Sequence, residues 1–88
     1  MRTIYKYELV MADTQEFFMP KKAVILDVQY QNEKMCVWAL VDTEDTLTTK
    51  RFTIIGTGNP ISKDIFPGLY IGTVQTGAFV WHVFHKDV

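Results

Sequence analysis

Residues 23–42 place the strongest constraint on what this chain can fold into. They read AVILDVQY, then a polar break QNEK, then MCVWALVD. Two runs rich in β-branched and aromatic residues on either side of a short polar break predict a β-hairpin. The second run is apolar at alternate positions on both sides, with Val37 and Ala39 on one face and Trp38 and Leu40 on the other. We therefore expect a central strand that is covered on both faces.

Further strands are predicted on both sides of the hairpin. Extended runs, most of them with alternating apolar and polar residues, predict strands near 3–10, 15–19, 47–55, 69–75 and 79–85, and no segment has a helical period. Residues 56–68 (GTGNPISKDIFPG) hold three of the five glycines and two of the three prolines, which predicts one long irregular loop. The chain is thus expected to form a single all-β domain over residues 1–88, a small antiparallel barrel or sandwich of about seven strands.

The same alternation assigns the core. In the first run of the hairpin the expected core face consists of Val24, Leu26, Val28 and Tyr30. Four large aromatic residues are expected in the core rather than in a platform for stacking nucleic-acid bases, namely Tyr5, Tyr7, Trp38 and Trp81.

Composition limits the classes of partner and the compartment that fit this protein. The formal charge of −1 and the scattered basic residues argue against general nucleic-acid binding, which needs a basic face. The single cysteine, Cys36, cannot form an internal disulfide, which fits a reducing compartment. No stretch resembles a signal peptide, and the apolar runs are too short to cross a bilayer. We expect a cytoplasmic protein without membrane contact.

The start of the glycine loop is the candidate binding segment, and it consists of Gly56, Thr57, Gly58, Asn59 and Pro60. It resembles a phosphate-binding loop only superficially, because it lacks the Gly-Lys-Ser/Thr ending and no helix follows it. The favoured interpretation is a set of turns that need positive φ angles. The alternative is a contact surface, since a rigid sheet can present such a loop to a ligand.

Two pairs of basic residues form the second candidate. Lys21–Lys22 and Lys50–Arg51 would make a small cationic patch beside the glycine loop if the two turns were neighbours. Lys21, Lys22 and Arg51 would then suit a small anionic ligand or an acidic partner. The favoured interpretation is two separate, solvated turns.

No combination of residues predicts catalysis. His82 and His85 are three apart on a strand, so they point to opposite faces and cannot bind one metal ion together. We expect His82 to be hydrogen-bonded and partly buried, and His85 to lie at a solvated end. Ser62 is the only serine, and nothing places a histidine and a carboxylate beside it. We therefore expect a protein that is not an enzyme and needs no cofactor or metal.

Several segments together resemble a known family. They are IYKYEL, a stretch ending in Met-Pro, AVILDVQYQ, WALVD, FTIIGTGNPI and YIGTVQTGAFVWHVF. They look like an uncharacterised family of short all-β proteins from bacteriophages and prophages, a domain of unknown function. Lys21–Lys22 departs from that pattern, which has a residue such as Glu and then Gly after Met-Pro.

The resemblance implies a phage-encoded accessory protein in the bacterial cytoplasm, with no catalytic residues to transfer. The leading hypothesis is a non-enzymatic protein that binds a bacterial host factor and could thereby inhibit host defence. The alternatives are a module that sequesters a small molecule or nucleotide, and a virion or assembly component. Self-association into a homo-oligomer would cover exposed strand edges.

Overall fold

Seven antiparallel strands make up the computed structural model, which describes residues 1–88. The strands are β1 (Arg2–Leu9), β2 (Thr14–Pro20), β3 (Val24–Gln31), β4 (Lys34–Asp42), β5 (Leu47–Gly56), β6 (Leu69–Thr76) and β7 (Phe79–Asp87). There is no helix, and so none that is long and apolar enough to cross a membrane. The predicted strands are all present, and the long loop occupies residues 57–68.

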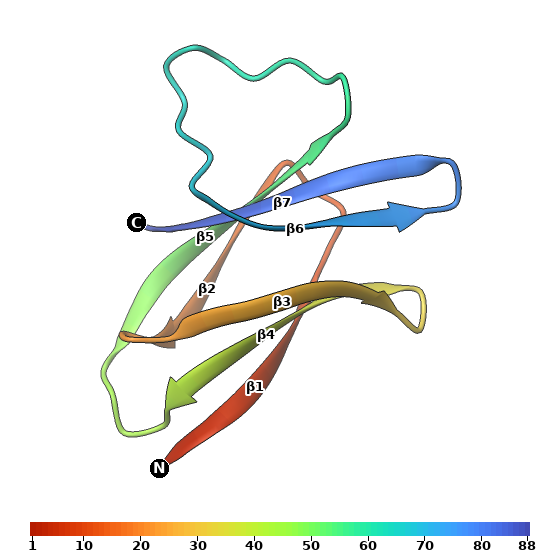
Figure 1. The fold of residues 1–88 in the computed structure, drawn as a ribbon. Coiled ribbons are helices and arrows are strands. Elements are labelled where there is room, and N and C mark those ends of the chain that lie inside the picture. Colours follow the sequence, from red (N-terminus) through yellow and green to blue (C-terminus); the bar gives the residue numbers. More distant parts are fainter.

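The strands form two sheets packed as a sandwich (Figure 1). One sheet has the order β1-β4-β3 and the other the order β2-β5-β7-β6. The sheets meet where β3 runs beside β6: a Cβ on Gly72 would lie 3.0 Å from Cγ1 of Val28. The predicted all-β antiparallel architecture is confirmed.

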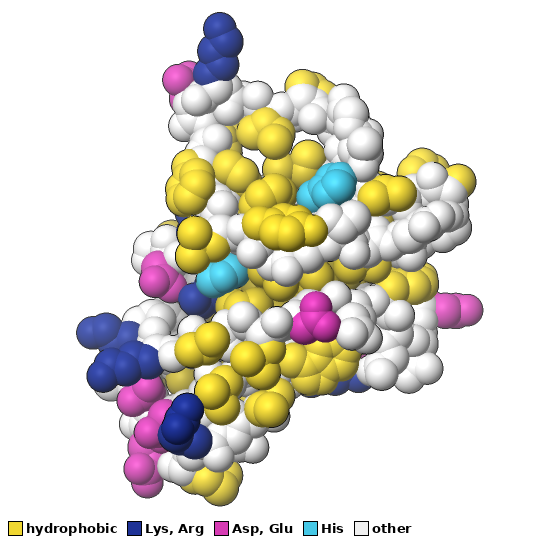
Figure 2. Space-filling model, in the orientation of Figure 1, with side chains coloured by type: hydrophobic (Ala, Val, Ile, Leu, Met, Phe, Trp, Pro, Cys, Tyr) yellow, Lys and Arg dark blue, Asp and Glu magenta, His cyan; other side chains and the backbone are white.

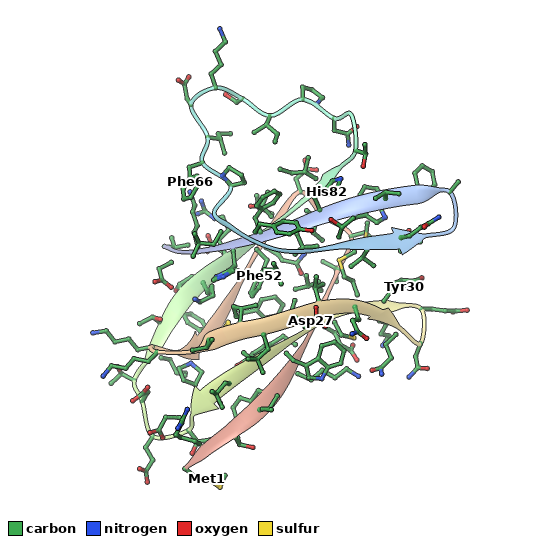
Figure 3. The ribbon with its side chains drawn as sticks, in the orientation of Figure 1. Met1, Asp27, Tyr30, Phe52, Phe66 and His82 are labelled. Atoms are coloured by element: carbon green, nitrogen blue, oxygen red, sulfur yellow. The ribbon has the colours of Figure 1, made fainter.

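The core lies between the two sheets and is built mainly from aliphatic residues, two methionines and one phenylalanine. Phe52 is completely buried near its centre (Figure 3). Its ring lies 5.7 Å from the ring of Phe17, which lies 5.7 Å from that of Tyr7, and both contacts are edge-on. Tyr7 and Trp81 pack against this core, as expected. Burial raises the pKa of Tyr7, with a further contribution from Tyr5.

The hairpin of β3 and β4 confirms one expectation and corrects another. β4 is the central strand of its sheet, and its inward residues Met35, Val37, Ala39 and Val41 are buried. On its outer face Cys36 is buried, whereas Trp38 and Leu40 are only partly covered. Trp38 belongs to this outer face, where the Lys6 ammonium lies 5.9 Å from its ring. The expected core position of Trp38 is therefore wrong. The expected core position of Tyr5 is also wrong, because Tyr5 is 41% exposed although it lies opposite the buried Ala39.

The expected core face of β3 is also wrong at three of four positions. Val24, Leu26 and Tyr30 are about half exposed, and only Val28 is buried. At Val24 and Leu26 the cause is a β-bulge: Ile25 pairs with Ala39 and Asp27 with Trp38, so Leu26 has no partner. An extra residue in one strand exchanges the faces of all residues on one side of it. Tyr30 points inward but lies near the open end of the strand (Figure 3).

Candidate functional site

The loop of residues 57–68 is the long irregular segment that the sheets hold in place. It leaves the end of β5, rises beyond β7 and returns to β6 (Figure 1). Both of its ends are fixed by specific contacts, and its middle carries exposed side chains.

The first end of the loop is a tight turn. The Asn59 N–H donates to the Gly56 carbonyl at 3.0 Å, and Gly58 has a φ of 86°. A positive φ at the third position of a turn favours glycine, so the predicted turn is confirmed here. The Thr57 N–H donates to the Val80 carbonyl at 3.1 Å, which extends the pairing of β5 with β7 by one residue.

A row of hydrogen bonds anchors this turn to the sheet. Thr57 Oγ1 lies 2.7 Å from His82 Nε2, and Thr73 Oγ1 lies 3.0 Å from His82 Nδ1. The Tyr70 hydroxyl lies 2.6 Å from Thr73 Oγ1. His82 is on β7 beneath the loop and is partly buried (Figure 3). The prediction that it is a hydrogen-bonded, partly buried side chain is confirmed.

The second end of the loop is held against β7. Gly68 has a φ of 117°, and a Cβ at this position would lie 2.2 Å from the carbonyl oxygen of His85. Only glycine fits such a close approach of two backbones. The Lys86 ammonium donates to the Phe66 carbonyl at 3.1 Å, which ties the returning limb of the loop to the same strand.

Between its two ends the loop encloses a cavity of about 420 Å³ against the outer face of β5 and β7. Arg51, Thr53 and Lys86 line it from the strands, and Asp13 and Thr14 line it from the start of β2. The loop contributes residues from Asn59 to Pro67, among them Ser62 and Asp64. Cavities of this volume can hold a small molecule or a side chain of a partner.

The charges around the cavity are balanced rather than cationic. Arg51 donates to Oε2 of Glu16 from Nε at 2.9 Å and from Nη2 at 2.7 Å. Asp13, Asp64 and Lys86 are the other charged residues of the lining. Two carboxylates and a paired guanidinium leave no surplus of positive charge for an anion. Arg51 does lie beside Asn59 and Pro60, as the sequence allowed, but it is already occupied by an ion pair.

The other predicted basic residues lie elsewhere. The Lys21 N–H donates to the Thr46 carbonyl at 2.9 Å, just before β5 begins. The glycine turn lies at the far end of β5, a ten-residue strand, which places the two about 30 Å apart. Lys21 and Lys22 thus form a separate turn, as the favoured interpretation stated, and do not join Arg51 or residues 56–60.

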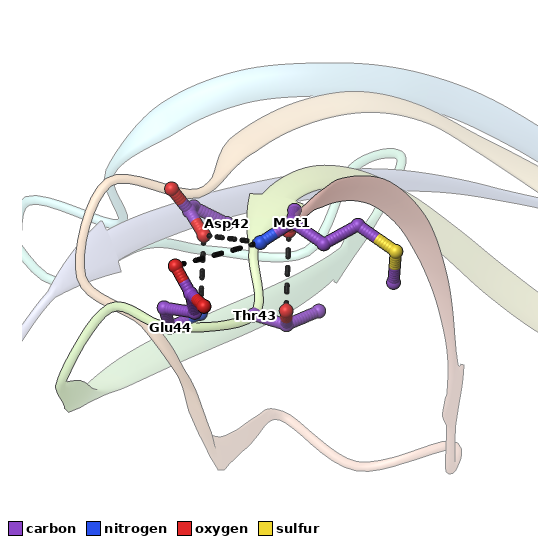
Figure 4. A network of polar contacts seen from close by, with 4 residues as sticks. All are labelled: Met1, Asp42, Thr43 and Glu44. Atoms are coloured by element: carbon purple, nitrogen blue, oxygen red, sulfur yellow. Dashed lines mark hydrogen bonds and ion pairs between the residues drawn. The ribbon is translucent and has the colours of Figure 1, made fainter.

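Lys22 instead borders a smaller cavity of about 270 Å³ that Arg2, Asp42 and Asp45 also line. A network of polar contacts lies beside it (Figure 4). The Met1 ammonium lies 3.2 Å from Oδ1 of Asp42 and 3.8 Å from Oε2 of Glu44. The Glu44 N–H and the Met1 ammonium lower the pKa of Asp42 below its ordinary value. This network is exposed, so its ion pairs contribute little to stability.

Lys50 and His85 both point into the sandwich, which corrects two expectations. Lys50 is buried, and its ammonium lies 3.2 Å from Oδ1 of Asp87, so it cannot belong to a surface patch. His85 is half-buried with its ring 6.3 Å from that of Phe52, and its Nδ1 has no hydrogen-bond partner. Burial and then the Lys50 ammonium lower the pKa of His85, while Asp87 raises it in part. The expected solvated end for His85 is wrong because its strand turns this residue inward.

No group of three or more histidine, cysteine, aspartate or glutamate side chains is arranged to hold a metal ion. Ser62 Oγ accepts the Asp64 N–H at 3.4 Å, within the loop. Both ring nitrogens of His82 lie against threonine hydroxyls instead. Cys36 is buried.

Comparison with known proteins places the chain in a family. A family model described as "Domain of unknown function (DUF7352)" matches residues 1–88. The chain belongs to DUF7352. No curated protein and no solved structure matches it. The expected membership in an uncharacterised family that covers the chain is confirmed at this level.

Several residues at the cavity of this DUF7352 chain were not found from its sequence. Asp13, Thr14 and Lys86 are far apart along the chain and carry no motif. Asp64 and Phe66 lie in the predicted loop but beyond residues 56–60. The one signal that could have pointed to them was the composition of the whole loop, where Ile61, Ile65 and Phe66 have no alternating pattern to bury them.

Proposed function

We propose that this chain is a non-catalytic binding protein that captures a protein partner through the loop of residues 57–68. The observation that carries the proposal is a set of exposed apolar side chains on and beside a loop with fixed ends. This set, called the loop surface below, consists of Ile61, Ile65, Phe66, Leu69 and Tyr70. Figure 2 shows hydrophobic side chains gathered on the loop and over the strands beneath it.

Exposed apolar side chains favour a partner because association removes them from water. Phe66 is 63% exposed, and the Lys86 contact to its carbonyl fixes the backbone that carries it. A surface that is already positioned loses little conformational entropy on binding. Aromatic side chains of this kind are enriched among the residues that dominate interface energies.

The chain's resemblance to short proteins of bacteriophages and prophages supports a bacterial host protein as the partner. In this proposal the protein is a phage-encoded accessory protein of the bacterial cytoplasm. It acts by occupying a host factor, and a component of host defence is the target class we favour.

The test is capture from bacterial lysate, identification of the captured protein, and titration of the purified pair by calorimetry. Phe66→Asp places a charge within the loop surface and should weaken binding about a hundredfold. Phe18→Asp is the matched control, since Phe18 is 74% exposed on β2 and lies outside the loop surface. Equal affinity of the Phe66 variant and the natural protein would reject the proposal.

A second candidate function rests on the cavity itself. Its volume of about 420 Å³ lies within the range of small-molecule sites. A nucleotide or other small ligand would stabilise only the folded state and raise the melting temperature. Because Arg51 is paired with Glu16, an anion would have to displace that carboxylate, so we expect inorganic phosphate alone to give no shift. A shift with nucleotides that Arg51→Ala removes would favour this function over the first.

A further inference from the structure

The outer face of the β1-β4-β3 sheet carries exposed apolar side chains. Ile4, Leu40 and Val24 lie in one row across the three strands, because Ile4 and Val24 both pair with Leu40. Ile4 and Val24 are 55% and 54% exposed, and the bulge adds the half-exposed Leu26. Figure 2 shows hydrophobic side chains over β4 and the first half of β3. A sheet face of this composition is one that a folded protein normally covers.

The next row on the same face carries opposite charges on its two sides. Lys6 on β1 and Asp27 on β3 both pair with Trp38, which lies between them on β4. Asp27 is held in place because its carboxylate accepts the Val28 N–H at 2.8 Å and the Gln29 Nε2 at 2.9 Å. The row thus has a lysine on one edge strand, a tryptophan in the middle and a carboxylate on the other edge strand. In the single copy the Lys6 ammonium reaches over the Trp38 ring and donates to Oε1 of Gln31 on β3 at 3.1 Å.

We propose that this face docks a second copy of the chain, with the two sheets face to face around a two-fold axis along β4. Such an axis places β1 of each copy over β3 of the other. Lys6 then exchanges its exposed hydrogen bond to Gln31 for Asp27 of the second copy, and this ion pair occurs twice. Ile4 faces Val24 of the second copy, and the two Trp38 side chains meet near the axis. A two-fold axis across the strands would instead set Lys6 against Lys6 and Asp27 against Asp27, so the axis along β4 is the one that makes the face complementary to itself.

The ends of the sheet are compatible with the same arrangement. Lys34 lies on β4 and would approach its own symmetry mate, but its ammonium lies 3.3 Å from Oε2 of Glu8 in the same copy. Three strands of about eight residues present a face of about 14 by 26 Å. This footprint is smaller than the ~800 Å² per partner of a standard interface, so the dimer should dissociate on dilution.

This dimer would not involve the proposed loop surface. The loop cavity lies against the outer face of β5 and β7, in the other sheet of the sandwich. Each copy would present its loop on the side away from the dimer contact. The inference therefore stands or falls independently of the proposed function, and a dimer would carry two loops for avidity toward a partner.

The test is analytical ultracentrifugation of the full 88-residue chain and of two charge variants, alone and mixed. Lys6→Glu faces Asp27 with like charge, and Asp27→Lys faces Lys6 with like charge, so each alone should dimerise about tenfold or more weakly. An equimolar mixture restores both ion pairs and should form a heterodimer. Each variant still carries its own substitution in the mixture, so the recovery can come only from contacts between the two copies.

Two controls accompany the mixture. Lys63→Glu changes an exposed charge in the loop and should leave dimerisation unchanged. Ile4→Lys, at an exposed position, should abolish the dimer without lowering the unfolding temperature, which covers the case in which Asp27→Lys folds poorly. A natural protein that stays monomeric at every concentration, or a mixture that associates no better than its components, would overturn the proposal.

Discussion

Gly68 shows how one residue can set the position of a whole loop. Its backbone approaches β7 so closely that a methyl group would overlap the His85 carbonyl, and its φ of 117° is unfavourable for any other residue. The position of this end of the loop therefore depends on the absence of a side chain at residue 68.

Gly68→Ala should lower the free energy of unfolding by about 3 kcal/mol or more, because the backbone must move as well as adopt a strained φ. Gly58→Ala is the matched control: Gly58 also has a positive φ of 86°, but a Cβ there meets nothing within 4 Å. That variant should lose only about 1 kcal/mol. Urea denaturation of both variants measures the difference. Equal losses of unfolding free energy would show that the close approach of Gly68 to the His85 carbonyl does not contribute.

His85 gives the fold a dependence on pH. Its pKa in the folded protein is lowered from the ordinary value near 6.5, with burial as the first cause. The unfolded chain therefore binds a proton more readily than the folded one as the pH falls through this range. The stabilisation associated with neutral His85 is fully present above pH 6.5 and is lost as the pH falls toward the folded-state pKa.

His85→Phe keeps an aromatic ring beside Phe52 and removes the titrating group. We expect the natural protein to lose stability relative to this variant when the pH is lowered from neutral to about 5.5. Urea denaturation at a series of pH values measures the two curves. The pKa of Asp42 is also lowered. Its effect on stability falls at a more acidic pH than that of His85, and it is the same in both proteins, so it does not alter the comparison. Parallel curves over the histidine range would contradict the assignment to His85.

At the scale of the element, the bulge in β3 decides which residues reach the surface. Because Leu26 has no partner on β4, its removal leaves every other pair of this hairpin as it is. A bulge of this kind bends its strand and increases the local twist. The apolar row on the outer face depends on it, since a straight strand would have turned Val24 inward together with Val28.

Deletion of Leu26 should therefore leave a folded protein whose free energy of unfolding changes by about 1 kcal/mol, the contribution of a half-buried leucine. Deletion of Val37 from β4 is the comparison, because it turns the remainder of a central strand over and exposes its buried residues. Near-ultraviolet circular dichroism and urea denaturation distinguish the two. An unfolded Leu26 deletion would mean that the bulge is needed for folding.

The whole molecule depends on a small core. A chain of 88 residues has a typical stability of about 4–13 kcal/mol. Only a few large side chains are completely buried, and Phe52 is the largest of them. Its edge-on contact with Phe17 connects β5 to β2, so it stabilises one sheet as well as the space between the two.

Phe52→Ala should cost about 3–5 kcal/mol and bring the protein near its unfolding threshold at 25 °C. Phe18→Ala, one residue from Phe17 but 74% exposed, should change the stability by less than about 0.5 kcal/mol. Thermal unfolding followed by circular dichroism compares the two. A small loss for Phe52→Ala would mean that the core can repack around the missing ring.

Much of the fold follows from local patterns in the sequence. The alternation in residues 34–42 requires a strand with two apolar faces, and the glycines and prolines of residues 56–68 exclude a regular element there. The turn at Gly58 also follows from near neighbours, whereas the threonines that bond His82 lie 25 and 9 residues away in the chain. The strand, the loop and the turn depend on side-chain direction and backbone conformation, which a few adjacent residues settle.

The tertiary structure alone decided which strands pair and what comes together. Alternation gives a strand two faces but does not specify which strands pair with it, so the meeting of Arg51 with Glu16 was not predictable. The bulge at Leu26, the inward turn of Lys50 and His85, and the cavity beneath the loop arise from register and packing between distant segments. The sequence by itself determined an all-β chain with one long loop, whereas long-range pairing determined the site, because contacts between distant residues leave no local pattern.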